Sequence, residues 1–303
     1  MRIDLKSDFG VSKAKTLIRR GFGVDRGNIV VLHPVEVAYL SVNGYSVYLS
    51  NKKLELLEVL KWCFQNKENV LLFFVFKDLR DRGRKVRISG KYLVGKDVFY
   101  PISERDFVDF SEIYGKKFIL AVVDEEGDVT YYKHYPWDCV GEQKEEIEKF
   151  NAVFAGDRVV TGENHIFEKY FYGSIKGNVV TLSLVEALYL LEKGKLNLNI
   201  KKEELVREAR KIEENFDDRF KLYKDLKKRN FVVKTGFKFG SDFRVYEKVR
   251  SIKELPHSKY LVKIAKKMKA SEIASHVRVA NAVRKKMVFY FNNNYLCFER
   301  IKI

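Results

Sequence analysis

Histidine exchanges a proton near neutral pH more readily than any other side chain, so it is the first residue type to search for acid–base chemistry. The chain has five histidines: His33, His134, His165, His257 and His276. A lone histidine is more often structural than catalytic. His257 stands out because it follows Pro256 in the polar connection 254–258, after the strand-like segment 242–249. This position predicts a loop residue near strand ends, where side chains commonly do chemistry.

A tyrosine and a basic segment could complete such a site. Tyr246 lies in the strand-like segment before His257, and the basic segment 278–285 follows later in the chain. The apolar spacing from Ile273 predicts that this segment is helical. On one helix, Arg278 and Lys285 would share a face about 10 Å apart, a spacing suited to a track of phosphates. An ordinary solvated helix face is the alternative.

The charge balance indicates a polyanionic partner. The 58 Lys and Arg residues exceed the 41 Asp and Glu residues, which gives a net charge of +17. Such an excess favours nucleic acid through counterion release, with an anionic membrane surface as the second choice. Surface ion-pair networks, as in thermophiles, would add acidic and basic residues about equally, so they do not explain the excess of basic residues.

The cysteines and the hydropathy pattern exclude several classes of protein. Cys63, Cys139 and Cys297 are far apart and form no CxxC pair, so we expect neither a zinc knuckle nor a disulfide framework. The N-terminus lacks the apolar core of a signal peptide, and no run of about 18 apolar residues occurs. We therefore expect a soluble, cytoplasmic protein with no membrane attachment.

The chain repeats itself, which indicates a duplicated architecture. The segment 27–32, Gly-Asn-Ile-Val-Val-Leu, recurs 177 − 27 = 150 positions later as Gly-Asn-Val-Val-Thr-Leu. In both copies the pattern predicts a strand and then a helix, which ends at Gly44 in one copy and at Gly194 in the other. Ser183 and Glu186 form a capping-box pattern at the second helix start.

Two further correspondences extend the repeat. Residues 76–79 match residues 223–226 at an offset of 223 − 76 = 147, within an amphipathic helical pattern in the second copy. The apolar runs 118–123 and 286–291 also correspond, and each precedes a polar turn and a β-rich run. Both copies are therefore predicted to end in a hairpin.

These patterns predict a mixed α/β fold of two tandem repeats that pack against each other, with the boundary near residue 150. Each repeat has a small helix-plus-sheet N-terminal subdomain and a nuclease-like mixed-sheet C-terminal subdomain. In the first repeat (1–150) these are about 1–65 and 66–150. In the second repeat (151–303) they are about 151–213 and 214–303.

Only the second repeat carries the polar groups described above. Counting back by 147 residues places Phe99 opposite Tyr246 and Phe110 opposite His257. The first repeat is therefore predicted to be degenerate and non-catalytic, and the second to be catalytic.

The motif 234–246, Lys-Thr-Gly-Phe-Lys-Phe-Gly-Ser-Asp-Phe-Arg-Val-Tyr, together with Pro256-His257 and the basic segment 278–285, resembles the archaeal tRNA-splicing endonucleases. The resemblance covers essentially the whole chain, because the long members of this family are tandem repeats with one live and one degenerate unit that form homodimers. It implies an endonuclease that cuts precursor tRNA at intron–exon junctions in bulge-helix-bulge RNA, with no metal or other cofactor.

The resemblance also implies roles for individual residues. Tyr246 would be the general base, His257 the general acid and Lys285 the cation that stabilises the transition state. RNA supplies its own 2′-hydroxyl nucleophile, so three such side chains suffice, and the products would be a 2′,3′-cyclic phosphate and a 5′-hydroxyl. Arg278 and Arg300 would clamp a bulged base, so recognition would depend on RNA shape.

An acidic loop in the first repeat resembles the loop that family members dock into a basic pocket of the partner subunit. Its carboxylates are Asp124, Glu125, Glu126 and Asp128. The alternative is a hairpin turn with Gly127 at the bend. A metal site ranks below both, because consecutive carboxylates on a tight turn rarely converge on one ion.

Two rival functions remain open from the sequence. A metal-dependent DNA nuclease would need carboxylates such as Asp138 and Glu142, which lie in the segment that joins the repeats. A non-catalytic RNA-binding or assembly subunit would need only the basic charge and the aromatic residues. Strict magnesium dependence would favour the first, and indifference to loss of His257 the second.

Overall fold

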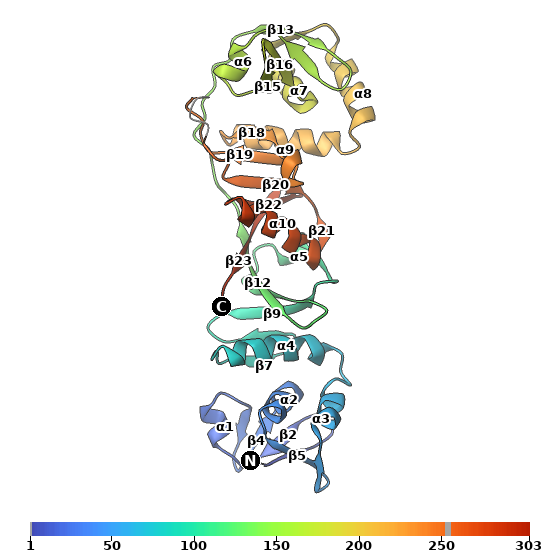
Figure 1. Ribbon diagram of the computed structural model, residues 1–303, viewed down its shortest axis with the longest axis vertical. Coiled ribbons are helices and arrows are strands. Elements are labelled where there is room, and N and C mark those ends of the chain that lie inside the picture. Colours follow the sequence, from blue (N-terminus) through green and yellow to red (C-terminus); the bar gives the residue numbers. More distant parts are fainter. Residues whose placement is uncertain (1, 252–255) are drawn as a thin grey trace.

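The computed structural model describes residues 2–251 and 256–303 and forms an elongated molecule (Figure 1). A six-stranded sheet lies at one end, a ten-stranded sheet occupies the middle, and a five-stranded sheet lies at the other end. Helices pack against each sheet, so the fold is mixed α/β, as predicted. None of the helices in these ranges has the length and apolar character that a membrane span needs.

The first repeat begins with the six-stranded sheet, in the order β3-β4-β2-β1-β5-β6, and its helices. These elements are β1 Arg2–Leu5, β2 Gly10–Ser12, α1 Thr16–Arg19, β3 Val24–Arg26, β4 Ile29–Leu32, α2 Pro34–Val42, β5 Ser46–Leu49, β6 Lys52–Leu54 and α3 Leu56–Cys63. The repeat continues with α4 Glu68–Asp81, β7 Arg87–Ser89, β8 Tyr92–Val94, β9 Val98–Ser103, β10 Phe107–Asp109, α5 Phe110–Ile113, β11 Ile119–Val123 and β12 Val129–Pro136.

The second repeat follows the same plan, beginning with the five-stranded sheet in the order β15-β16-β14-β13-β17. The elements up to the third helix are β13 Phe150–Phe154, β14 Val159–Thr161, α6 His165–Glu168, β15 Ser174–Lys176, β16 Val179–Leu182, α7 Leu184–Glu192, β17 Leu196–Leu198 and α8 Lys202–Ile212. The remainder are α9 Phe216–Lys228, β18 Val232–Thr235, the 3₁₀ turn η1 Phe237–Phe239, β19 Phe243–Tyr246, β20 Tyr260–Ile264, β21 Lys267–Lys269, α10 Ala270–Ala282, β22 Lys286–Phe291 and β23 Asn294–Ile301.

The two repeats are joined edge to edge in the ten-stranded sheet, whose order is β18-β19-β20-β22-β23-β12-β11-β9-β8-β7. Its midline is the antiparallel pair β12–β23, which runs from Tyr131 opposite Ile301 to Pro136 opposite Leu296. The order of strands is mirrored about this line. The predicted terminal hairpins, β11–β12 and β22–β23, are confirmed.

An apolar core shared by both repeats covers one face of this junction. Phe110 from the first repeat lies 4.9 Å from Phe289 and 5.7 Å from Phe298, measured between ring centroids. All three rings are buried. Burial of aromatic rings this large favours a fixed arrangement of the two repeats, so the prediction that they pack against each other is confirmed.

The duplicated strand–helix unit has the caps that the sequence predicts. Ser183 and Glu186 form a capping box at the start of α7, and His33 and Glu36 form one at the start of α2. Gly44 and Gly194, just past the ends of these helices, have φ angles of 83° and 65°. Glycine is favoured there because a side chain strains this left-handed conformation.

The basic segment is only partly helical, so the prediction that Arg278 and Lys285 share a helix face is wrong. Helix α10 ends at Ala282. Arg284 then adopts a left-handed conformation with a φ of 57°, and the backbone N–H of Lys285 donates to the carbonyl of Ala280. The chain turns at this point to enter β22.

The constant offset used to compare the repeats is also wrong near the site. Strands β8 and β9 are joined by the short turn 95–97, whereas β19 and β20 are joined by the longer connection 247–259. Phe99 lies in β9 and Phe110 begins α5, so neither occupies the place of Tyr246 or His257. The first repeat has Gly-Lys-Asp at 95–97, and thus no histidine in this connection.

Candidate active site

Tyr246 ends β19, the second strand from the edge of the ten-stranded sheet. Its side chain is 6% exposed and packs in a small apolar cluster with Phe171, Val232 and Val249. The ring centroid lies 6.0 Å from the guanidinium carbon of Arg244. These neighbours fix the ring, which leaves the phenol in a defined position beside a cation.

His257 is exposed and lies just before β20, in the connection that follows Tyr246. It lines a pocket of about 450 Å³ together with Tyr246, Glu247, Arg250 and Lys259. The structure thus brings the predicted tyrosine and histidine to one pocket. Residues 252–255 of the predicted polar connection lie outside the described residues.

Lys285 is buried and lies between the end of α10 and β22. Its Nζ donates to the carbonyl of Val283 at 3.4 Å. Burial lowers the pKa of this ammonium, and the positive charge of Arg244 lowers it further. Lys285 is not among the residues that line the pocket of Tyr246 and His257; the group that neighbours both Lys285 and Tyr246 is Arg244.

A second pocket, of about 470 Å³, also has Tyr246 in its lining. It lies between the five-stranded sheet's subdomain and strands β18 and β19. Apolar rings such as Phe167 and Phe171 line it, and so do Lys234 and Arg244. Tyr246 therefore lines both the pocket that contains His257 and one that is lined by four basic residues, Arg158, Arg219, Lys234 and Arg244.

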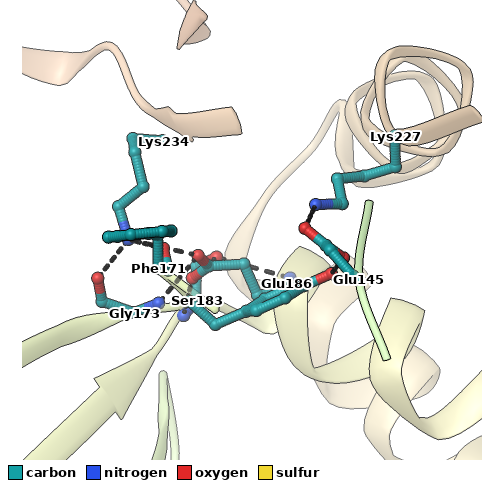
Figure 2. A network of polar contacts seen from close by, with 8 residues as sticks. Glu145, Phe171, Gly173, Ser183, Glu186, Lys227 and Lys234 are labelled. Atoms are coloured by element: carbon teal, nitrogen blue, oxygen red, sulfur yellow. Dashed lines mark hydrogen bonds and ion pairs between the residues drawn. The ribbon is translucent and has the colours of Figure 1, made fainter. Parts of the chain in front are cut away.

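Lys234 belongs to a buried polar network on this second pocket, shown in Figure 2. Its Nζ lies 3.6 Å from the carboxylate of Glu186 and donates to the carbonyl of Phe171 at 2.8 Å. Glu186 also accepts from the backbone N–H groups of Gly173 and Ser183, both at 2.9 Å. Burial lowers the pKa of Lys234, and Glu186 opposes that effect.

A similar arrangement occurs in the first repeat. Glu36 is buried and accepts from the backbone N–H groups of Gly23 and His33. Burial raises the pKa of this carboxyl group, while nearby Arg80 and Arg87 lower it. Because both repeats have this carboxylate with its two backbone donors, the arrangement belongs to the duplicated architecture and is not particular to the pocket of Tyr246.

Arg278 and Arg300 share a third pocket, of about 300 Å³, with Asp124, Asp128 and Tyr132. The structure brings the two predicted RNA-binding arginines together, on α10 and β23. It also places part of the acidic loop beside them within one chain, an arrangement that the sequence did not predict.

The acidic loop is the turn between β11 and β12. The Asp124 carboxylate accepts from the backbone N–H groups of Glu126 at 3.0 Å and Asp128 at 2.9 Å. Gly127 has a φ of 88°, and Glu125 pairs with Arg105 at 2.7 Å. The loop therefore has the conformation of the alternative, a hairpin turn with Gly127 at the bend, and Glu125, Glu126 and Asp128 remain on the surface.

The other histidines have structural surroundings. His33 caps α2, and His134 lies between Phe118 and Phe298, where burial lowers its pKa to about 4. Burial also lowers the pKa of His276, and His165 lies 3.6 Å from Glu163. Within residues 2–251 and 256–303, no group of three or more His, Cys, Asp or Glu residues is arranged to hold a metal ion.

Comparison with known proteins gives the same assignment by an independent route. Residues 150–210 match the family model of the tRNA intron endonuclease N-terminal domain, and residues 216–296 match that of the tRNA intron endonuclease catalytic C-terminal domain. The second match contains Tyr246, His257 and Lys285.

Full-length relatives agree with the domain matches. The chain is 34% identical to the tRNA-splicing endonuclease of Methanosarcina acetivorans, with 93% of each chain covered. It is 33% identical to the enzyme of the same name from Methanosarcina mazei, with 100% of this chain and 99% of the relative covered. It is also 33% identical to the tRNA-splicing endonuclease of Haloarcula marismortui, with 89% of this chain and 87% of the relative covered. The chain is an RNA endonuclease that belongs to the archaeal tRNA-splicing endonuclease family.

Proposed function

We propose that this protein excises introns from precursor tRNA by making the 2′-hydroxyl of the RNA attack the adjacent phosphate. The observation that carries the proposal is the pocket shared by Tyr246 and His257, inside the segment that matches the family's catalytic domain. A phenol and an imidazole in one pocket can take a proton from one oxygen and give a proton to another.

In the proposed step, the 2′-oxygen forms a bond to phosphorus while the bond from phosphorus to the 5′-oxygen breaks. Tyr246 faces the 2′-hydroxyl and accepts or orients its proton. His257, which is exposed and free to meet RNA, donates a proton to the departing 5′-oxygen. Lys285 holds a positive charge next to the crowded phosphate. The products are a 2′,3′-cyclic phosphate and a 5′-hydroxyl.

We propose that Arg278 and Arg300 hold a bulged base. A guanidinium group is flat and can stack on a base of any sequence. The two arginines share a pocket, which supports a joint role. The substrate would then be a bulge-helix-bulge RNA, recognised by its shape.

The assembly is also a proposal. The surface carboxylates Glu125, Glu126 and Asp128 would dock into a basic pocket of a second copy, and the C-terminal subdomains would complete a homodimer. In each copy the first repeat (1–150, divided near 65) would be the scaffold, and the second repeat (151–303, divided near 213) would cut the RNA.

Cleavage without a metal or other cofactor is tested with the purified protein, an intron-bearing precursor tRNA and excess EDTA. We expect two cuts, each leaving a 2′,3′-cyclic phosphate that blocks ligation until it is opened. A single 2′-deoxy substitution at the cut removes the nucleophile and should abolish that cut. Strict magnesium dependence, or cutting of the 2′-deoxy RNA, would overturn the proposed chemistry.

A further inference from the structure

Arg244 lies closer to the proposed chemistry than its place in the sequence suggests. It precedes Tyr246 by two positions on β19, so the two side chains lie on the same face of the sheet. In the antiparallel pair β18–β19, Arg244 lies directly opposite Lys234. Its positive charge lowers the pKa of both Lys234 and Lys285, so Arg244 is near both ammonium groups.

The charge of Arg244 is not neutralised by the described part of the protein. No carboxylate of residues 2–251 or 256–303 forms an ion pair with it, although nearby Arg219 pairs with Glu213 and Asp242. Its Nε is buried and has no hydrogen-bond acceptor within the same ranges. A buried donor left without an acceptor costs free energy, as does a cation held beside other cations.

An anionic ligand in the second pocket, which Arg244 lines, would offset the uncompensated charge. A guanidinium group can donate two parallel hydrogen bonds to two oxygens of one phosphate, which an ammonium group cannot do. The RNA that approaches Tyr246 carries one phosphate per nucleotide. The charge without a paired carboxylate, the pocket that Arg244 lines and the adjacent phenol of Tyr246 thus indicate a place for a phosphate.

We infer that Arg244 contacts a non-bridging oxygen of the scissile phosphate, next to Lys285, and is a further catalytic residue of this enzyme. This inference rests on the proposed function, because it needs the cut to occur beside Tyr246. The second pocket provides the approach, since both Arg244 and Tyr246 line it. The RNA strand would pass between that pocket and the one that contains His257.

The test compares Arg244→Gln, Arg244→Lys and wild type in single-turnover cleavage of precursor tRNA in EDTA, with RNA affinity measured on the 2′-deoxy substrate. We expect Arg244→Gln to lower the cleavage rate about 100-fold, as loss of one transition-state donor commonly does. Affinity should change far less, and Arg244→Lys should recover part of the rate. Arg207→Gln, which removes one exposed charge from α8, is the matched control and should cleave normally.

A phosphorothioate, in which sulfur replaces a non-bridging oxygen at the cut, distinguishes a direct contact of Arg244 from a purely structural role. Sulfur in place of the contacted oxygen should slow wild type strongly and Arg244→Gln little, because the contact is already missing. Equal slowing in both proteins would overturn the inference. So would a wild-type cleavage rate in Arg244→Gln, or a rate loss matched by a fall in its unfolding temperature.

The outcomes also separate this inference from the proposed function. If wild type cleaves, His257→Ala does not, and Arg244→Gln cleaves normally, only the role of Arg244 fails. If wild type cuts the 2′-deoxy substrate, the proposed function fails and the role of Arg244 fails with it.

Discussion

Tyr246 and Lys285 lie on opposite sides of Lys259, the residue just before β20. The backbone N–H of Lys259 donates to the carbonyl of Val245 at 2.9 Å, and that of Lys286 donates to the carbonyl of Lys259 at 3.0 Å. Tyr246 follows Val245 in the chain, and Lys285 precedes Lys286. Tyr246 and Lys285 therefore lie in one row with Lys259, across three neighbouring segments. Backbone hydrogen bonds of the sheet, and not a helix face, set their spacing.

Replacing His257 with alanine should reduce cleavage without affecting folding. The side chain is exposed, and its removal takes away the proton donor for the 5′-oxygen. We expect a rate loss of about 10²- to 10⁴-fold in single-turnover cleavage at neutral pH. His165→Ala, in the N-terminal subdomain of the second repeat, should keep the wild-type rate. A variant at position 257 that cleaves normally would favour the RNA-binding subunit.

Lys285 should determine where activity declines at alkaline pH. Burial lowers its pKa from the usual lysine value, so it loses its charge at a lower pH than an exposed lysine does. The contribution of its charge is complete below that pKa and is lost as pH rises through it. Rates measured across pH should show this decline in wild type.

Two variants identify the group responsible for the decline. Lys285→Met should be slow at every pH, whereas Lys285→Arg should keep its charge and lose the alkaline decline. Lys302→Met, which changes an exposed lysine near the C-terminus, should retain the wild-type profile. If Lys285→Arg declines at the same pH as wild type, Lys285 is not the titrating group.

Arg278 and Arg300 should govern affinity for bulged RNA. Stacking of one base is worth roughly 1–3 kcal/mol, so changing both to alanine should weaken binding about 10- to 100-fold. Changing both to lysine should not restore affinity, because an ammonium group has no flat face. Affinity is measured with the 2′-deoxy precursor and with a fully paired RNA. An equal loss on both RNAs would show that the arginines contact only phosphates.

The carboxylate of Glu186 should matter for stability. Glu186→Gln leaves the buried ammonium of Lys234 without its counter-charge, which we expect to cost about 3–5 kcal/mol in the free energy of unfolding. Adding Lys234→Met should return part of that loss, since the uncompensated charge is then gone. Denaturant unfolding measures both effects. The exposed Glu203→Gln should change stability by less than about 0.5 kcal/mol. A similar small change for Glu186→Gln would contradict this account.

The acidic loop can be tested without breaking its turn. Asp124 must stay, because its carboxylate holds the turn through two backbone N–H groups. Reversing the charges of Glu125 and Glu126 to lysine should convert a dimer to a monomer, as measured by light scattering. Charge reversal at Glu203 on α8 is the control. A dimer that survives the loop variant at all protein concentrations would exclude this docking.

The sequence predicted the repeated architecture well because its signals are local. The capping box at Ser183 and the left-handed glycines Gly44 and Gly194 depend on a few adjacent residues, and the structure confirms them. The helix at 278–285 failed for the opposite reason. Its pattern continues past Ala282, but the chain must turn at Arg284 to pair β22 with its partners, and a short window cannot show that requirement.

For the candidate site, the sequence predicted the residue types but not how they are arranged in space. Tyr246 and His257 were predicted, and the structure places them in one pocket, but the length of the connection between them made the constant offset between the repeats wrong. Arg244, which we infer to contact the phosphate, was not predicted, although its place two residues before Tyr246 in a strand was a usable signal. The approach of Lys285 to Arg244 depends on long-range strand order, which no local pattern contains.

The central claim is that Tyr246, His257 and Lys285 act on one phosphate. Its most direct test is an experimental structure of the protein bound to precursor tRNA with a 2′-deoxy nucleotide at the cut. We predict that the phenol lies within hydrogen-bond distance of the 2′ position, the imidazole next to the 5′-oxygen, and the ammonium next to the phosphate. A phosphate held elsewhere, with any one of the three side chains out of reach, would contradict the account.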